Sequence, residues 1–154
     1  MRIAIMGSGD LGGLFGGLLN KAGADVLFIA RGQQLEALQN SGLSIVSDLG
    51  NFDLPDITVD DGTEGLGPVD FVFFTVKGQD TQVTADLIAP LVGPSTGIIS
   101  FHNGVEGIDI LAENFSPEAV IPGTTMTAAV IEEPGVIRHV GSPTRPITIG
   151  EWND

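Results

Sequence analysis

The first part of the chain alternates short apolar runs with polar or glycine-rich breaks. Residues 2–6 form an apolar run, and the sequence Gly-Ser-Gly-Asp-Leu-Gly at residues 7–12 interrupts it. A second apolar run covers residues 25–30. Between the two runs, apolar side chains recur at helical spacing, at Leu11, Phe15, Leu18, Leu19 and Ala22. The pattern predicts a strand, a glycine turn, an amphipathic helix and a second strand, which together form a βαβ unit.

The rest of the chain continues this alternation as far as Gly123 and then changes. Strand-like runs lie at residues 43–46, 57–59, 69–76, 97–101 and 119–122, with a short piece near Phe52. Helical patterns lie at residues 33–40, 83–91 and 105–114, and the second of them places Val83, Leu87, Ile88 and Leu91 on one face. After Gly123, strand-like runs at residues 124–131, 136–140 and 147–149 follow one another without a helix, which favours antiparallel pairing. We therefore expect one domain over residues 1–154, an α/β Rossmann-type, doubly wound and mainly parallel sheet with a C-terminal antiparallel extension.

The glycine turn has the spacing of a dinucleotide-binding fingerprint. Gly7 allows a sharp bend from strand to helix, Gly9 allows close approach of a pyrophosphate, and Gly12 allows tight packing of helix on strand. The free N–H groups of the helix N-terminus favour phosphate binding. Asp10 would repel a nearby phosphate, so we expect its side chain to point away from the ligand. The alternative is a glycine-rich turn with a purely structural role.

The end of the second strand indicates which dinucleotide is bound. NAD-binding domains place an acidic residue there for the ribose 2′-hydroxyl group, whereas this chain has Ala30 followed by Arg31. The planar guanidinium group of arginine matches phosphate geometry, so Arg31 favours the 2′-phosphate of NADP. The alternative is a solvated surface arginine.

Two further strand ends carry candidate binding residues. Lys77 could face a phosphate, a ribose or a substrate carboxylate, or could be an ordinary surface lysine. Asn103 could bind a nicotinamide amide or a substrate oxygen, or could belong to an Asn-Gly turn. We expect a structural role for His102 and a position on the surface of a sheet for His139. The sequence shows no metal-ligand cluster and no Ser/His/Asp arrangement.

Composition narrows the choice of function. The formal net charge is −14 and the chain contains no cysteine, so nucleic-acid binding, disulfides and thiolate metal sites are not expected. The mean hydropathy of +0.29 suits strands that are buried on both faces. No apolar run approaches the roughly 20 residues that cross a membrane, and residue 2 leads directly into a strand. We therefore expect a cytoplasmic protein without a membrane partner or a signal peptide.

Five sequence blocks together resemble the ketopantoate reductase (2-dehydropantoate 2-reductase) family. They lie at residues 2–13, 30–32, 75–77, 102–106 and 123–129, in the family's order and across the whole chain. The resemblance implies NADPH-dependent reduction of ketopantoate, or of a related 2-keto acid, in pantothenate and coenzyme A synthesis. It implies a cofactor site made of Gly7, Ser8, Gly9, Asp10, Leu11, Gly12, Arg31, Lys77, Asn103 and Ala129. Asn103 would also contact the substrate.

The resemblance also implies that a part of the enzyme is missing from this chain. Family members continue into a helical second domain that supplies a lysine as general acid, and we expect the present chain to be the cofactor-binding half, inactive alone. The other interpretations are the NADP-binding domain of a 3-hydroxy-acid or 6-phosphogluconate-type dehydrogenase, a stand-alone NADP sensor, or a degenerate fold that binds nothing. Trp152 and the apolar strands after Gly123 would lack their normal cover, so we expect that a homodimer forms there.

Overall fold

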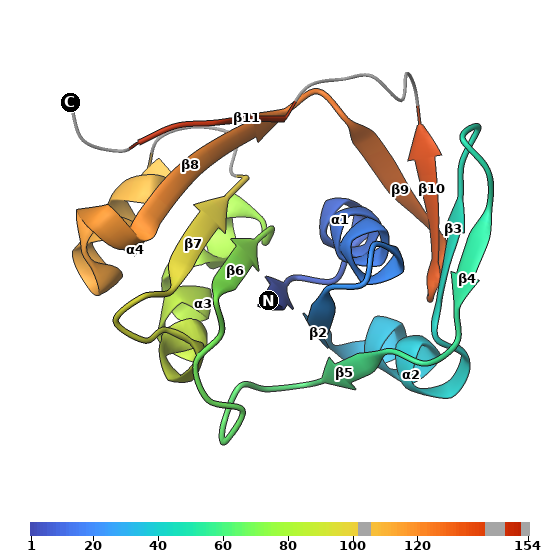
Figure 1. The fold of residues 1–154 in the computed structure, drawn as a ribbon, viewed down its shortest axis with the longest axis horizontal. Coiled ribbons are helices and arrows are strands. Elements are labelled where there is room, and N and C mark those ends of the chain that lie inside the picture. Colours follow the sequence, from blue (N-terminus) through green and yellow to red (C-terminus); the bar gives the residue numbers. More distant parts are fainter. Residues whose placement is uncertain (102–105, 141–146, 152–154) are drawn as a thin grey trace.

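The protein is built around a seven-stranded sheet in the order β11-β8-β7-β6-β1-β2-β5 (Figure 1). This computed structural model describes residues 1–101, 106–140 and 147–151. The strands are β1 (Arg2–Met6), β2 (Asp25–Ile29), β5 (Thr58–Asp60), β6 (Phe71–Phe74), β7 (Gly97–Ser100), β8 (Val120–Thr125) and β11 (Ile147–Ile149). All neighbouring pairs are parallel except β8 with β11. The predicted doubly wound, mainly parallel α/β sheet is confirmed.

Alternate residues of β1 enter two different hydrophobic cores, one on each face of the sheet. Ala4 and Met6 belong to the core that includes residues of α3 (Thr81–Ile88) and α4 (Glu106–Phe115). Ile3 and Ile5 belong to the core that includes residues of α1 (Asp10–Lys21) and α2 (Gly32–Ser41). Helices therefore cover both faces, which explains why the strands are apolar throughout rather than alternating (Figure 1).

The strand order reverses next to β1, and this reversal places the site. β1 pairs with β2 on one side and with β6 on the other. The chain first moves outward through β2, and it later returns to the other side of β1 to form β6. In an open parallel sheet, ligands bind outside the carboxyl ends of the strands at such a switch point. The relevant strand ends are those of β1, β2 and β6.

A second, four-stranded sheet in the order β4-β3-β10-β9 covers α1 on the side away from the main sheet (Figure 1). It consists of β3 (Leu43–Val46), β4 (Phe52–Leu54), β9 (Ala128–Glu133) and β10 (Val136–Val140). β9 and β10 pair antiparallel as predicted, but β10 also pairs parallel with β3. The predicted antiparallel extension is thus divided: β11 joins the main sheet and the β9–β10 hairpin joins the second sheet. The predicted single strand at residues 124–131 is wrong, because the chain leaves the main sheet between β8 and β9.

The buried face of α1 differs from the predicted one. The prediction placed Leu18 on the apolar face, but this side chain is 46% exposed. The buried residues of the helix are Gly12, Gly13, Leu14, Phe15, Gly16 and Gly17. A β-carbon added at Gly13 would lie 2.8 Å from Ile137 of β10, so the glycines let both sheets approach the helix closely. Similarly, Val83 of α3 is exposed rather than buried, and Thr81, Thr84, Ala85 and Ile88 form the covered face.

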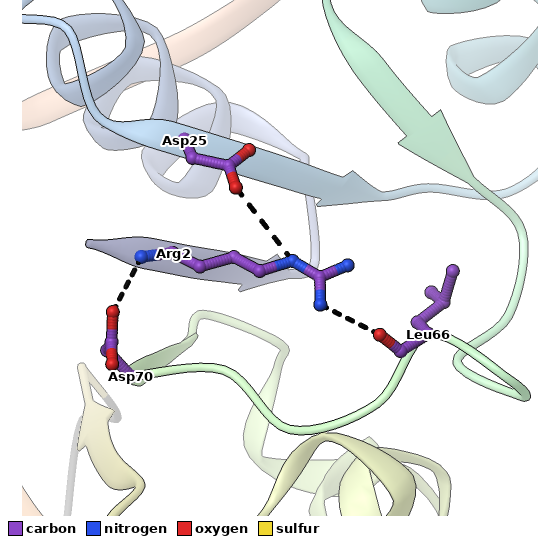
Figure 2. Close-up of polar contacts among 4 residues, drawn as sticks. All are labelled: Arg2, Asp25, Leu66 and Asp70. Atoms are coloured by element: carbon purple, nitrogen blue, oxygen red, sulfur yellow. Dashed lines mark hydrogen bonds and ion pairs between the residues drawn. The ribbon is translucent and has the colours of Figure 1, made fainter.

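A polar cluster around Arg2 fixes the amino-terminal ends of the strands (Figure 2). The Arg2 backbone N–H donates to Asp70 Oδ2 at 2.7 Å, and Arg2 Nη1 donates to the carbonyl oxygen of Leu66 at 2.8 Å. Arg2 Nε lies 4.0 Å from Asp25 Oδ2. These contacts join the start of β1 to the start of β2 and to the segment before β6. They lie at the end of the sheet opposite the switch point, so we assign them to stability rather than to the site.

Candidate functional site

Two adjoining cavities lie at the carboxyl ends of β1, β2 and β6. The first has a volume of about 350 Å³, and the second about 370 Å³. The first is lined by the glycine turn, the end of β2, α2, the segment from Val76 into α3 and one residue of β9; its lining includes Gly7, Ser8, Gly9, Arg31, Gln34 and Ile131. The second is lined by residues that include Asp10, Leu11, Thr75, Lys77, Phe101 and Ala129. Val76 lines both cavities, so they are neighbours, and we treat them together as the candidate site for an elongated ligand.

The glycines of the turn have the structural roles that their spacing predicts. Gly7 has a φ of +97°, a conformation that side-chain-bearing residues rarely adopt. A β-carbon added at Gly12 would clash with the Gly7 carbonyl oxygen and would lie 2.5 Å from Thr75 Oγ1. At Gly9, a β-carbon would meet only Ile131 Cδ1, at 4.0 Å. The backbone at Gly9 is therefore open to the first cavity, which is the condition for close approach of a phosphate group.

Ser8 holds the turn against β2. Its backbone N–H and its hydroxyl group both donate to the carbonyl oxygen of Ile29, at 3.1 and 3.0 Å. The residue is 3% exposed, so its hydroxyl group acts within the protein. Ser8 thus fixes the glycine turn to the strand that ends beside Arg31.

Asp10 begins α1 and borders the second cavity. Asp10 Oδ1 accepts a hydrogen bond of 2.8 Å from the backbone N–H of Leu11. This carboxylate therefore takes up one of the N–H groups that a helix N-terminus offers to an anion. Asp10 is not among the residues that line the cavity beside Arg31.

Arg31 follows β2 directly and lines the first cavity with its side chain exposed. Within the described part of the chain, no carboxylate lies within 4.0 Å of its guanidinium group. Asp80, at the end of the short helix η1 (Gly78–Asp80), also lines this cavity. No acidic residue follows β2 directly, and Asp80 was not predicted as a lining residue because it reaches the cavity from the end of a different strand, β6.

The structure brings the predicted residues together in two groups. Gly7, Ser8, Gly9 and Arg31 line the first cavity, and Asp10, Leu11, Lys77 and Ala129 line the second. Gly12 lies beneath the turn, between the Gly7 carbonyl group and Thr75. Asn103, His102 and Trp152 lie outside the described residues. Their predicted roles stay predictions.

Several lining residues were not predicted from the sequence. Ile131 reaches the first cavity from β9, and Gln34 reaches it from α2. Phe101 lines the second cavity and packs against Phe15 of α1, with ring centroids 5.0 Å apart and ring planes tilted by 48°. Only the position of Phe101 at the end of a strand could have indicated it; the other two depend on how distant segments pack.

His139 occupies a less exposed environment than the predicted surface of a sheet. It is half-buried on β10, and its Nδ1 lies 3.0 Å from Ser47 Oγ. It borders a third, largely apolar cavity of about 390 Å³ beside α1.

No helix in the described part of the chain is both long and apolar enough to cross a membrane.

Fold and site together define a Rossmann-type domain with a glycine turn at the carboxyl end of its first strand. A sequence model of the family described as ketopantoate reductase PanE/ApbA matches residues 3–154. The chain therefore belongs to the ketopantoate reductase family.

Individual relatives agree with this assignment. The 2-dehydropantoate 2-reductase of Mesorhizobium japonicum is 32% identical over 161 residues, which cover 91% of this chain and 49% of that protein. The enzyme of the same name from Archaeoglobus fulgidus is 38% identical over 141 residues, covering 91% of this chain and 44% of the relative. A crystal structure of 2-dehydropantoate 2-reductase from Geobacter metallireducens superposes with a TM-score of 0.92 at 36% identity, covering 99% of this chain and 50% of that one. The chain thus spans about half the length of the relatives it matches.

Proposed function

We propose that this chain is the cofactor-binding half of an NADPH-dependent reductase of ketopantoate or a related 2-keto acid. Membership of the ketopantoate reductase family supports the reaction class. The observation that carries the choice of NADPH is the position of Arg31, which lines the same cavity as the open backbone of Gly9. A dinucleotide whose pyrophosphate lies at the turn would place its adenosine 2′-phosphate toward that guanidinium group.

Each group of residues has a separate task in this proposal. NADPH, when bound, supplies a hydride to the ketone carbon of the substrate. Gly9 and the N-terminus of α1 receive the pyrophosphate, and Arg31 binds the 2′-phosphate. Lys77 and Ala129 line the cavity that would receive the nicotinamide end. Asn103 would contact both nicotinamide and substrate.

Reduction of a ketone also needs a proton donor for the developing alkoxide. We propose that this donor, and the remaining substrate contacts, come from the part of the relatives that this chain does not match. The chain alone should then bind NADPH without oxidising it in the presence of ketopantoate. Appreciable turnover by the chain alone would contradict this division of labour.

Calorimetric titration with NADPH and, separately, NADH tests the cofactor assignment. We expect wild type to bind NADPH more tightly than NADH. Arg31→Ala should weaken NADPH binding by about ten- to a hundredfold, because a charge-assisted contact is lost. The same substitution should leave NADH binding unchanged. Arg138→Ala is the matched control, because Arg138 is exposed on β10 and pairs only with Glu132 among the described residues. If Arg31→Ala weakened NADPH and NADH binding equally, Arg31 would not be the residue that binds the 2′-phosphate.

We also propose that copies of the chain associate through β11, the edge strand of the main sheet. Its apolar side chains Ile147 and Ile149 are 49% and 58% exposed. An exposed edge strand with apolar side chains tends to pair with another chain. Sedimentation that shows only monomer at high protein concentration would contradict this proposal.

A further inference from the structure

Gln34 joins two segments on different sides of the first cavity. Its side chain extends from α2, where Nε2 donates to the Ser8 carbonyl oxygen at 3.0 Å and Oε1 accepts from the Gly135 N–H at 3.0 Å. A backbone carbonyl group only accepts and a backbone N–H group only donates, so the two partners fix the orientation of the amide. One half-buried side chain thus connects the glycine turn to the hairpin between β9 and β10.

At the glycine turn, Gln34 binds the peptide group between Ser8 and Gly9, which the N–H and hydroxyl groups of Ser8 do not hold. The N–H and hydroxyl groups of Ser8 are both directed to Ile29. The Ser8 carbonyl group belongs to the planar peptide unit that continues to the Gly9 N–H, which donates to the Gly7 carbonyl oxygen at 2.7 Å. The hydrogen bond from Gln34 and the one between Gly9 and Gly7 therefore together hold this peptide plane at the point where the backbone is open to the cavity.

At the hairpin, Gln34 holds the turn that positions β9. Gly135 has a φ of +84°, and its carbonyl oxygen accepts from the Ser44 N–H at 2.9 Å. With its own N–H bound to Gln34, this residue is fixed on both sides. β9 carries Ile131, the residue nearest to the position of a β-carbon at Gly9. The two hydrogen bonds of Gln34 thus link the glycine turn to the hairpin that carries this wall of the cavity.

We propose that Gln34 is a positioning residue that holds the phosphate-binding turn and the β9–β10 hairpin at the spacing required by a bound dinucleotide. This inference rests on the proposed function, since it concerns the same NADPH site. Gln34 acts here through the backbone of Ser8 and Gly135. Its loss should consequently affect NADPH and NADH alike, in contrast to the loss of Arg31.

Gln34→Met tests the proposal, because methionine has a similar length and forms neither hydrogen bond. We expect NADPH and NADH binding to weaken by the same factor. This factor should be about tenfold, which is the usual effect of losing one or two well-placed hydrogen bonds. Gln33→Met is the matched control, since Gln33 is the exposed neighbour on the same helix and does not line the cavity. Unchanged binding in Gln34→Met, or weakened binding of NADPH alone, would overturn the positioning role.

Hydrogen exchange in wild type provides a second test that needs no variant. Gly135 does not line the first cavity, but its N–H is bonded to Gln34. Saturating NADPH should slow exchange of the Gly135 amide, and unchanged exchange would contradict the coupling. If wild type binds NADPH and these effects are absent, only the role of Gln34 fails. If wild type binds neither dinucleotide, the proposed function itself fails and the role of Gln34 fails with it.

Discussion

The hydroxyl group of Thr75 lies 2.9 Å from the carbonyl oxygen of Gly7. It also lies 3.0 Å from the carbonyl oxygen of Met6. One side chain after β6 thus holds the end of β1 and the first residue of the glycine turn. The same oxygen atom fills the space beside Gly12, where a β-carbon would lie only 2.5 Å away. The shape of the turn therefore depends on β6 as well as on its own glycines.

Replacing the Thr75 hydroxyl group with a methyl group should loosen the glycine turn while keeping the volume of the side chain nearly the same. We expect Thr75→Val to lower the free energy of unfolding by about 1 kcal/mol, since the single hydroxyl hydrogen shared by the two backbone carbonyl groups is lost. NADPH binding should weaken several-fold. Denaturant unfolding and calorimetric titration measure the two effects, and Thr75→Ser, which keeps the hydroxyl group, should restore most of both. Unchanged stability and affinity in Thr75→Val would show that the contact is unimportant.

Asp10 is expected to oppose binding of an anionic cofactor. Its carboxylate accepts from the Leu11 N–H at the start of α1, where phosphate groups would otherwise bind. We predict that Asp10→Ala tightens NADPH binding by about three- to tenfold at low salt, and that high salt reduces this gain. The same change should cost about 0.5–1 kcal/mol of stability, because the helix loses an N-terminal acceptor.

Two further variants separate the effect of charge at Asp10 from the loss of its hydrogen bond. Asp10→Asn removes the charge but keeps an acceptor, so it should tighten binding with a smaller loss of stability. Glu113→Ala removes an exposed carboxylate from α4, at a residue that lines neither cavity, and should change affinity little. Weaker binding in both Asp10 variants would show that Asp10 helps to hold the ligand.

Lys77 should contribute to cofactor binding in a way that differs from Arg31. It lines the second cavity rather than the first, so it lies away from the proposed 2′-phosphate position. We predict that Lys77→Met weakens NADPH and NADH binding equally, by about two- to fivefold, the effect of an exposed charge. Lys21→Met is the control, since Lys21 lies over the ring of Phe52 at 4.1 Å and lines neither of these two cavities. If Lys77→Met weakened the binding of NADPH alone, the 2′-phosphate would lie in the second cavity beside Lys77 and not in the first cavity beside Arg31.

The features that the sequence predicts well are those set by local constraints. β1, the glycine turn and β2 follow from an apolar run, a residue with positive φ and a second apolar run. The position of Arg31 beside the turn follows from the parallel pairing of β1 with β2. Each of these depends on neighbouring residues or on one common rule of sheet topology.

The features that escaped prediction depend on contacts between distant segments. Gln34 and Gly135 are hydrogen-bonded although 101 positions separate them. The β9–β10 hairpin carries an ordinary strand pattern, and nothing in that pattern shows that it pairs with β3 instead of the main sheet. On α1 the prediction of Phe15 as a buried residue is confirmed, but the buried glycines were not predicted, because glycine contributes no apolar side chain although its small size lets the sheets approach.

The last prediction concerns this glycine face. A β-carbon added at Gly16 would clash with Cε1 of Phe28 and would lie 2.8 Å from Cγ1 of Ile5. Both residues are fully buried in β2 and β1, so neither can move aside without disturbing the core. We expect Gly16→Ala to lower the free energy of unfolding by about 1–3 kcal/mol, although alanine favours helix.

Gly62→Ala provides the contrast for this prediction. A β-carbon there would meet no atom within 4 Å, and the residue does not have a positive φ. We expect it to be neutral, or to stabilise the protein by about 0.4–1 kcal/mol, because alanine reduces the freedom of the unfolded chain. Urea unfolding of the two variants beside wild type measures the difference. If Gly16→Ala were as stable as Gly62→Ala, the helix could move away from the sheet at little cost, and the close approach of α1 to the main sheet would contribute little to stability.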